Sequence, residues 1–562
     1  MKYDVCVVGS GAGAGPVIYE LSKAGFNVVV LEKGPWFKTE HFSKDEMVAT
    51  RRDLYKSDLE GEFHVVESKN DAGEWEAKTT QASGKSYWNG NCVGGSSNFM
   101  SAYFHRLKPN DFKLASTYPD TYEGSNTVDW PISYDDLEPY YAKVETEIGV
   151  SGKVVPHKAL EPRSTEDFPY PPLGTNVFGE WVKEAAKEEN VQTFPAPRGI
   201  ISSPKGKRKA CYHSNYCGSF GCSSDAKGSS RAALLDQAIE TGNCKIIPHA
   251  KVFHLDCGDG EEIQRAKYYD SSGEKNIVEA RLFVVACQAV ETSRLLLMSK
   301  SDKFPNGLAN NSGNVGKNLL FAGGGAGSGI FDLNKLDEDK RKKFDIPLTF
   351  VNQATQDFYE IDDEEFGPVT KGGTIDFLIE HSAPMPKLIR QKRDENGKLL
   401  YGSALKSKIH DSFRNKKRVR FEVFNDWIPN DDSFIKLSEE HVDKWGDPVG
   451  HIRIGYLDEM IRVGKYIAKK ATRILFHTGA RDLQFTISGA PPRNLMAGGC
   501  RFGTDPKTSV LDANCQAHEV NNLYVTDASF MPTGGSVPYT FTIYANSFRV
   551  ADKIIERLNS EA

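Results

Sequence analysis

The sequence predicts an α/β protein built around a Rossmann-like dinucleotide-binding unit. Three observations support this prediction. A strand, a glycine-rich turn and a helix follow one another from Lys2, a second strand ends in a carboxylate, and β-type runs dominate a later stretch of the chain. At 562 residues the chain is too long for one ordinary hydrophobic core, so we expect two or three domains.

The first element is an apolar β-type run over residues 2–8, which leads directly into the turn. The turn carries the fingerprint Gly9-x-Gly11-x-x-Ala14, whose small third residue still allows close packing of helix on strand. The glycines let the backbone approach a pyrophosphate, whose charge lies at the helix N-terminus. The second strand ends in Glu32, about 20 residues on, where a carboxylate binds the adenosine ribose hydroxyls. The early position of this unit and the chain length favour FAD over NAD.

The composition excludes several classes of partner. A net charge of −6 gives no nucleic-acid footprint, and the basic run at 205–209 is expected to be a solvated loop. No apolar stretch approaches the roughly 18 residues needed to span a bilayer, and no secretory signal is recognised. By sequence we therefore expect a soluble, cytoplasmic protein that is not integral to a membrane.

Four ordered segments together resemble the glucose-methanol-choline (GMC) family of flavin oxidoreductases. They are the glycine-rich loop 88–98, the pair of runs 106–112 and 129–141, the strand-to-helix segment 283–297 and the C-terminal block 498–552. Within the family the strongest likeness is to flavoprotein subunits of bacterial gluconate, sorbitol, fructose and glucose dehydrogenases.

The resemblance implies a division of the chain into two domains. A discontinuous FAD-binding domain would be assembled from residues 1–160, 200–330 and 485–562. An antiparallel-sheet substrate domain over 331–484 would roof the flavin. Its β-type runs include 373–379 and 418–424, and residues 455–477 read as one amphipathic helix.

The resemblance also implies the residues that contact FAD. Val252 would contact the adenine, with ordinary strand core as the alternative. Asp527 would lie near the pyrophosphate or ribityl chain, with a helix or turn cap as the alternative. The remaining members of the implied FAD-binding set come from the glycine-rich loop and the C-terminal block: Gly94, Gly95, Ser96, Asn98 and Thr540.

The catalytic centre departs from the family pattern. Alcohol-oxidising members use a histidine, partnered by a histidine or asparagine, to take the hydroxyl proton. These positions fall here on Leu495 and Pro538, and neither side chain can move a proton. Tyr539 and His381 are the candidate replacements, each with a packed, non-catalytic side chain as the alternative interpretation.

Three functions remain open from the sequence. The favoured one is an FAD-dependent dehydrogenase acting on a hydroxyl of a sugar, sugar acid or glycoside and passing electrons to a partner. The second is a flavin enzyme that reduces or desaturates a C–C bond, for which the missing histidine is no obstacle. The third is a non-catalytic electron-transfer subunit.

A cysteine group, Cys211, Cys217 and Cys222, lies within the loop 200–230. In the resembling dehydrogenases a loop at this point holds a three-iron (3Fe–4S) cluster that passes electrons towards a haem subunit, and three thiolates suffice for it. The spacing differs from that of the relatives, so a zinc site with His213 or unligated thiols are alternatives. The resemblance also implies a small export subunit, which would place the complex in the periplasm.

Overall fold

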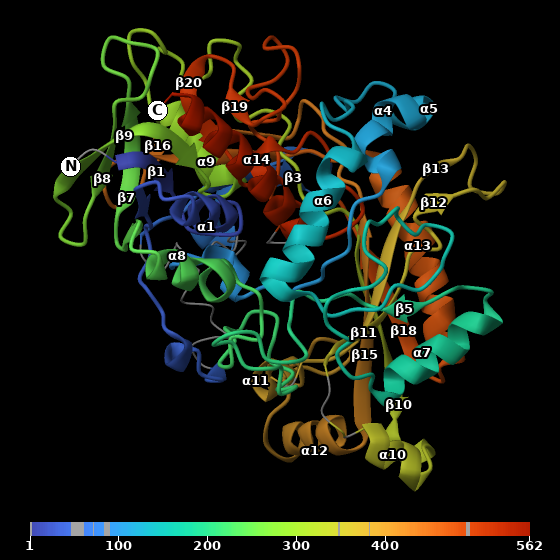
Figure 1. The fold of residues 1–562 in the computed structure, drawn as a ribbon. Helices are drawn as coiled ribbons and strands as arrows, with labels where there is room; N and C mark the ends of the chain where they lie inside the picture. Colours follow the sequence, from blue (N-terminus) through green and yellow to red (C-terminus); the bar gives the residue numbers. More distant parts are fainter. Residues whose placement is uncertain are drawn as a thin grey trace.

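The computed structural model describes residues 3–46, 61–70, 72–83, 90–344, 346, 349–381, 383–490 and 495–561. Lys2, Trp88, Asn89 and Asn494, which belong to segments named above, lie outside the described residues. Figure 1 shows two main parts, a nucleotide-binding half around β1, β9 and α14 and a long sheet around β10, β15 and β18.

The nucleotide-binding half is built on a mainly parallel sheet. Its strands follow the order β19–β20–β9–β1–β2–β6, and only the edge pair β19–β20 is antiparallel. The bounds are β1 Tyr3–Val8, β2 Val28–Leu31, β6 Cys244–Ile247, β9 Lys275–Val285, β19 Gln516–Ala517 and β20 Val520–Val525. Residues 28–31 are all buried, which is typical of a parallel strand covered on both faces.

Helices complete this half of the molecule. The helix α1 (Gly15–Lys23) follows the glycine turn, α9 (Ala289–Met298) follows β9, and α14 (Thr540–Ser560) ends the chain. The helices α1 and α14 pack against each other, and α14 also packs against α6 (Tyr134–Val144). A hairpin of β7 (Lys251–Asp256) and β8 (Arg265–Tyr269) extends from β9.

The second sheet is antiparallel and six-stranded, in the order β18–β10–β15–β14–β11–β5. Its strands are β5 Phe194–Pro195, β10 Gly325–Asp332, β11 Val351–Thr355, β14 Gly373–Ile379, β15 Lys416–Asn425 and β18 Arg481–Ile487. The expected runs 373–379 and 418–424 coincide with β14 and lie within β15. The predicted fold class, a Rossmann-like α/β unit combined with an antiparallel sheet, is therefore confirmed.

One face of this sheet is covered by two helices, α7 (Val177–Glu188) and α13 (Asp458–His477), seen beside it in Figure 1. The helix α13 begins three residues later than expected. Its buried positions Val463, Ile467, Ala471 and Ile474 recur at helical spacing and explain why it packs on the sheet.

Strand pairing departs from the expected division of the chain. The strands β16 (Phe434–Val442) and β17 (Pro448–Ile454) lie inside 331–484, yet they join β3 (Val65–Lys69) and β4 (Trp75–Thr79) in a separate four-stranded sheet. In turn, β10 begins before residue 331. The alternation of apolar residues predicts strands, but it does not specify their partners.

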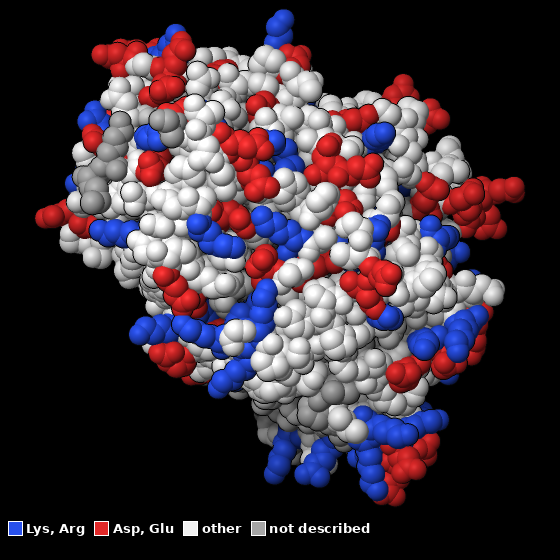
Figure 2. Space-filling model, viewed as in Figure 1, with Lys and Arg blue, Asp and Glu red and all other residues white. Residues whose placement is uncertain are grey.

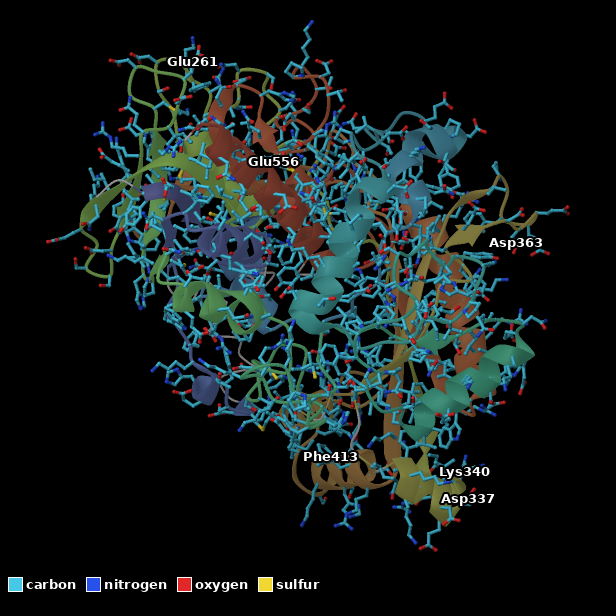
Figure 3. The ribbon with its side chains drawn as sticks, viewed as in Figure 1. Glu261, Asp337, Lys340, Asp363, Phe413 and Glu556 are labelled. Atoms are coloured by element: carbon cyan, nitrogen blue, oxygen red, sulfur yellow. The ribbon has the colours of Figure 1, made fainter. Side chains whose placement is uncertain are left out.

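Within the described ranges, no helix is long and apolar enough to cross a membrane. Positive and negative groups are interspersed over most of the face in Figure 2. In Figure 3 the labelled Glu261, Lys340 and Asp363 lie at the edge of the molecule.

Candidate active site

A cavity of about 1080 Å³ runs from the glycine turn to the six-stranded sheet. Residues from both halves line it, including Gly11 of the glycine turn and Arg418 of β15. The volume reaches the upper end of the range for ligand pockets, so the cavity can hold a large cofactor together with a substrate.

The glycine turn forms the first wall. Gly9 has a φ of +93°, and a Cβ there would lie 2.4 Å from the carbonyl oxygen of Ala286. A Cβ at Gly13 would lie 2.6 Å from the Cα of Asp527. Gly11 lines the cavity, and a Cβ there would meet only the Cα of Gly95, at 3.9 Å, among the described residues, which leaves room for a ligand. Ala14 is fully buried at the start of α1, as close packing of the helix requires.

Glu32 lies at the end of β2 and lines the cavity. Its carboxylate accepts hydrogen bonds from Ser10 Oγ at 2.5 Å and from the backbone N–H of Gly34 at 2.9 Å. Burial raises the pKa of this carboxyl, and the two hydrogen bonds oppose that rise. Its position is the one that the ribose contact requires, and that contact stays a prediction.

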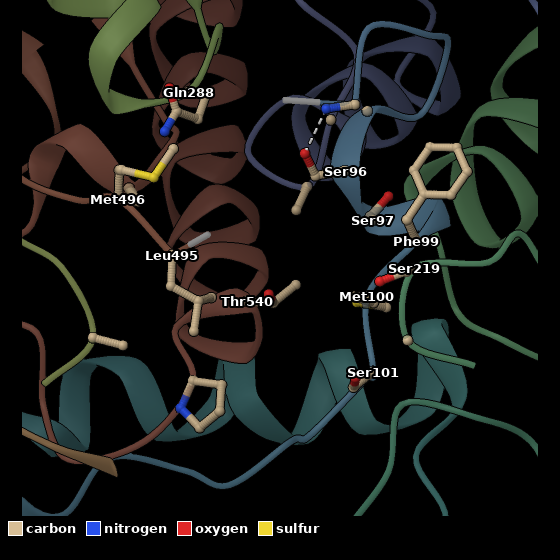
Figure 4. A pocket seen from close by; sticks show the side chains of 18 of the residues that line it. Ser96, Ser97, Phe99, Met100, Ser101, Ser219, Gln288, Leu495, Met496 and Thr540 are labelled. Carbon is tan, nitrogen blue, oxygen red and sulfur yellow. Dashed lines mark hydrogen bonds between the residues drawn. The ribbon is translucent and has the colours of Figure 1, made fainter. Parts of the chain in front are cut away.

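The glycine-rich loop presents Gly95, Ser96 and Ser97 to the cavity. In Figure 4 Ser96 accepts a hydrogen bond of 2.8 Å from the backbone N–H of Gly90. Gly94 and Asn98 stand behind this surface. Gly94 donates to Ser10 Oγ at 3.0 Å, and Asn98 Nδ2 donates to the carbonyl of Val93 at 2.9 Å. Gly94 and Asn98 thus hold the loop in place, while Gly95, Ser96 and Ser97 face the cavity.

Three further members of the expected set line the cavity: Val252 on β7, Asp527 after β20 and Thr540 at the start of α14. Asp527 is also a cap, because its carboxylate accepts from the backbone N–H groups of Gln288 at 2.9 Å and Ser529 at 2.8 Å. Burial raises the pKa of Asp527. Asp527 therefore both caps the backbone and forms part of the cavity wall.

These residues fit FAD. The glycine cradle has no space for a Cβ at Gly13, the N-terminus of α1 begins beside the cavity, and Glu32 stands at the end of β2. Gln288 also lines the cavity, and its buried Nε2 has no hydrogen-bond partner among the described residues. An amide donor in this position is available to a ligand.

Apolar side chains line the cavity at the two positions where the resemblance implies a proton acceptor and its partner. Leu495, Met496 and Pro538 line the cavity, and Figure 4 places Leu495 and Thr540 across from Ser96 and Ser97. Leu495 has a φ of +62°, a conformation that leucine rarely adopts. Backbone strain of this kind concentrates at functional sites.

His381, one of the two predicted replacements, lines the cavity just after β14. Its ring lies 4.1 Å from that of Phe350, measured between centroids, and Nδ1 has no partner in the described structure. Burial lowers the pKa of His381 to about 3, with Arg420 and Arg198 acting in the same direction. The imidazole is therefore neutral at ordinary pH and accepts a proton poorly.

Tyr539, the other predicted replacement, does not belong to the cavity lining. Its side chain is buried, a Cβ at Gly534 would lie 2.9 Å from its hydroxyl, and that hydroxyl has no partner among the described residues. Burial and the neighbouring Asp426 raise the pKa of Tyr539 well above its usual value. Its catalytic role stays a prediction, and the geometry gives it no direct access to substrate.

Sequence reasoning missed a row of charged residues on β15. Arg418, Arg420 and Glu422 alternate with buried Val419 and Phe421 and line the cavity. This period-two pattern was visible in the sequence and indicated a charged face on an apolar strand.

Glu422 in this row is held by a tyrosine from the first part of the chain. The hydroxyl of Tyr103 donates to Glu422 Oε2 at 2.9 Å, and Arg420 lies 3.6 Å from the other carboxylate oxygen. Tyr103 also lines the cavity, and burial raises its pKa well above the usual value. The cavity therefore contains an oriented carboxylate that the sequence did not reveal.

The predicted metal site is not supported. Across the residues that the structure describes, no group of three or more His, Cys, Asp or Glu side chains is placed to hold a metal ion, and this includes Cys211, Cys217 and Cys222. Instead, buried Lys227 organises the loop by donating to the backbone carbonyls of Cys217 and Phe220, both at 2.8 Å. Burial lowers the pKa of Lys227 to about 8.

Comparison with known proteins gives a consistent result. Residues 184–321 and 429–547 match the N-terminal and C-terminal family models described as GMC oxidoreductase. The chain is 27% identical over 568 residues to 6'''-hydroxyparomomycin C oxidase of Streptomyces lividus, covering 100% of the chain and 92% of the relative. It is 25% identical to the fructose dehydrogenase large subunit of Gluconobacter japonicus, covering 99% of the chain and 98% of the relative.

A solved structure extends the likeness to the whole fold. Pyridoxine 4-oxidase from Mesorbium loti superposes with a TM-score of 0.60 at 16% identity, covering 98% of this chain and 99% of that one. The two halves and their arrangement therefore follow the fold of that solved structure.

Proposed function

We propose that this chain is a member of the GMC oxidoreductase family and an FAD-dependent enzyme that oxidises a hydroxyl of a carbohydrate-like small molecule, because models of that family match residues 184–321 and 429–547. The observation that carries this proposal is the single cavity. It joins the glycine cradle at Gly11 to a charged strand face at Glu422, so that cofactor and polar substrate meet in one space.

The chain's own residues would divide the work in the following way. Gly11, Glu32 and Asp527 bind the cofactor, and FAD when bound supplies the acceptor for the hydride that leaves the carbinol carbon. Leu495, which lies across from Ser96 in Figure 4, and Pro538, another apolar residue of the lining, would exclude water from this part of the cavity.

The hydroxyl proton needs an acceptor, which the family histidine does not supply here. Of the cavity residues, His381 has a pKa lowered to about 3, which makes it a poor acceptor. We assign the role to the Glu422 carboxylate, because Tyr103 orients it and it lines the same cavity. Because Tyr539 does not line the cavity, it would act on the substrate only through another group that does.

A second candidate function is reduction or desaturation of a C–C bond. The apolar wall of Leu495, Met496 and Pro538 favours it, because such a reaction makes different proton demands at this position. We do not propose a non-catalytic electron-transfer subunit, because both matching family models describe oxidoreductases.

For the electron acceptor we propose a partner protein. The relative from Gluconobacter is named as the large subunit of a dehydrogenase, which motivates this choice. An iron–sulfur relay through Cys211, Cys217 and Cys222 is not part of the proposal, because these thiols form no ligand group in the described structure.

The test is anaerobic reduction of the purified flavoprotein by a panel of sugars, sugar acids and glycosides. Loss of the visible flavin absorption with at least one of them, slowed in Glu422→Gln, supports alcohol oxidation. Bleaching by no hydroxyl compound, together with reoxidation of reduced flavin by an activated alkene, would favour the second candidate.

A further inference from the structure

We propose that the part of the cavity lined by the charged face of β15 is a subsite for an oxyanion carried by the substrate, a carboxylate or a phosphate, with Arg418 as its main ligand. This inference rests on the proposed function and deepens it, because it names the charge of the substrate.

The subsite is placed by the pleat of β15. Alternate residues of a strand face the same side, so Arg418, Arg420 and Glu422 point into the cavity while Val419 and Phe421 are buried on the other side. The neighbouring strand β14 ends at Ile379, which is paired with Val419 of β15. The next residue, Glu380, also lines the cavity.

Three arginines but only two carboxylates line this part of the cavity. Arg390 forms an ion pair with Glu380, and Arg420 lies 3.6 Å from Glu422. The Arg418 side chain makes no hydrogen bond or ion pair with any residue that the structure describes, and its Nε is buried. Two of the three arginines thus have a carboxylate partner, and the third is left without one.

The environment of Arg418 is unfavourable for a cation. Burial lowers its pKa, Glu380 opposes this shift, and Arg390 and Arg420 add to it. Arg418 is half-buried. Because a guanidinium stays protonated in proteins, the unfavourable environment leaves a partly desolvated positive charge that the neighbouring arginines repel. An oxyanion would offset this cost and engage the planar fork of donors that suits carboxylates and phosphates.

Neighbouring groups restrict the subsite to anions. His381 is neutral because its pKa is lowered to about 3, so it contributes a hydrogen bond without charge. The two carboxylates of the lining that lie beside Arg418, Glu380 and Glu422, already have arginine partners and leave no free negative group here for a cationic substrate.

The spacing along the strand agrees with a substrate of sugar size. Arg420 and Arg418 lie two and four residues from Glu422, about 7 and 13 Å along the strand. With the length of the arginine side chains, an oxyanion at one end of a hexose can reach the guanidinium groups while a hydroxyl at the other end stays near Glu422.

The experiment uses the oxidised holoenzyme and four matched hexoses: glucose, glucuronate, glucose 6-phosphate and glucosamine. Dissociation constants are measured from the change in the visible flavin spectrum on rapid mixing, at constant ionic strength. We expect an anionic hexose to bind at least about tenfold more tightly than glucose, and glucosamine to bind more weakly than glucose. Comparison of glucuronate with glucose 6-phosphate shows whether the subsite prefers a carboxylate or a phosphate.

Two variants connect the effect to the residue. Arg418→Gln should remove about tenfold of the preference for the anion, and Arg418→Lys should restore part of it. The matched control is Arg414→Gln, an exposed arginine at the end of α12 (Gly402–Arg414) outside the cavity lining, which should leave all four constants unchanged.

The possible outcomes separate the two proposals. Binding that follows charge without any flavin reduction keeps the subsite and refutes alcohol oxidation. Equal binding of glucose and both anions, binding of neither anion, or a preference for glucosamine overturns the subsite, whether or not the flavin is reduced.

Discussion

Tyr103 and Glu422, which are 319 positions apart in the sequence, meet in the cavity through a hydrogen bond of 2.9 Å from the phenol to the carboxylate. Tyr103 follows the glycine-rich loop, whereas Glu422 lies on β15 of the antiparallel sheet. The contact joins the two halves of the molecule where cofactor and substrate would meet. It gives the chain an oriented carboxylate in a cavity where Leu495 stands at the position that the GMC resemblance implies for a histidine.

Removing this carboxylate should impair the chemical step. Glu422→Gln is expected to slow flavin reduction by substrate about 10²- to 10⁴-fold, because a positioned proton acceptor contributes that much. Stopped-flow reduction under anaerobic conditions measures it.

Tyr103→Phe should have a smaller effect of about tenfold, since it loosens the carboxylate without removing it. Tyr118→Phe is the matched control, because its hydroxyl donates to Glu360 at 2.6 Å outside the cavity lining. An unchanged rate in Glu422→Gln would remove this residue from the mechanism.

Installing the family pair should create a second proton acceptor. The double variant Leu495→His, Pro538→Asn is expected to reduce flavin faster with an alcohol, with a rate that rises as pH passes through about 6 to 7. Histidine is also more common than leucine at a positive φ, which Leu495 adopts at +62°. A pH profile identical to that of the wild-type protein would contradict the assigned position.

The glycine cradle can be tested without activity. Gly13→Ala would place a Cβ 2.6 Å from the backbone of Asp527, so we expect the variant to be purified with little or no FAD. Gly260→Ala is the control, because its nearest neighbour would be an ordinary 3.5 Å away. The measurement is the ratio of flavin to protein absorbance, and full occupancy in Gly13→Ala would refute the cradle.

A buried carboxyl predicts the pH dependence of stability. Burial raises the pKa of Asp426 to about 7, with Lys371 opposing and Asp111 adding to the shift. A carboxyl whose pKa is raised on folding stabilises the fold below its unfolded pKa, and this stability is lost as pH rises through the folded pKa. The melting temperature should therefore fall between about pH 5 and pH 8.

Asp426→Asn should flatten this dependence and melt higher than the wild-type protein at the upper pH, because the amide cannot ionise. Asp431→Asn, a carboxylate in the same connection after β15, serves as the matched control. Parallel melting curves of the wild-type protein and Asp426→Asn would show that this group does not titrate as described.

Much of the fold followed from local patterns in the sequence. The spacing of Gly9, Gly11 and Glu32 predicted the nucleotide-binding unit because the backbone geometry of that turn permits few other residues. The β-type runs at 373–379 and 418–424 predicted β14 and β15. The pairing of β17 with β3 could not be predicted, since the two strands lie nearly 400 positions apart in the sequence.

The site was only partly predictable, for a related reason. The residues predicted to bind the cofactor lie in contiguous motifs, whereas the proposed substrate end is assembled from Tyr103, His381 and the face of β15. Tyr539 lies next to the cavity-lining Pro538 in sequence, yet its own side chain is buried outside the cavity lining. The three cysteines are close in sequence, but buried Lys227 takes the backbone carbonyls between them.

The central claim is that one cavity brings FAD and a hydroxyl-bearing, anionic substrate together. The most direct measurement is anaerobic titration of the purified holoenzyme with glucuronate, glucose 6-phosphate and glucose, following the visible flavin absorption. We predict that the flavin is reduced by an anionic sugar at lower concentration than by the neutral one. Flavin that remains oxidised with every sugar, while dithionite reduces it fully, would contradict the account.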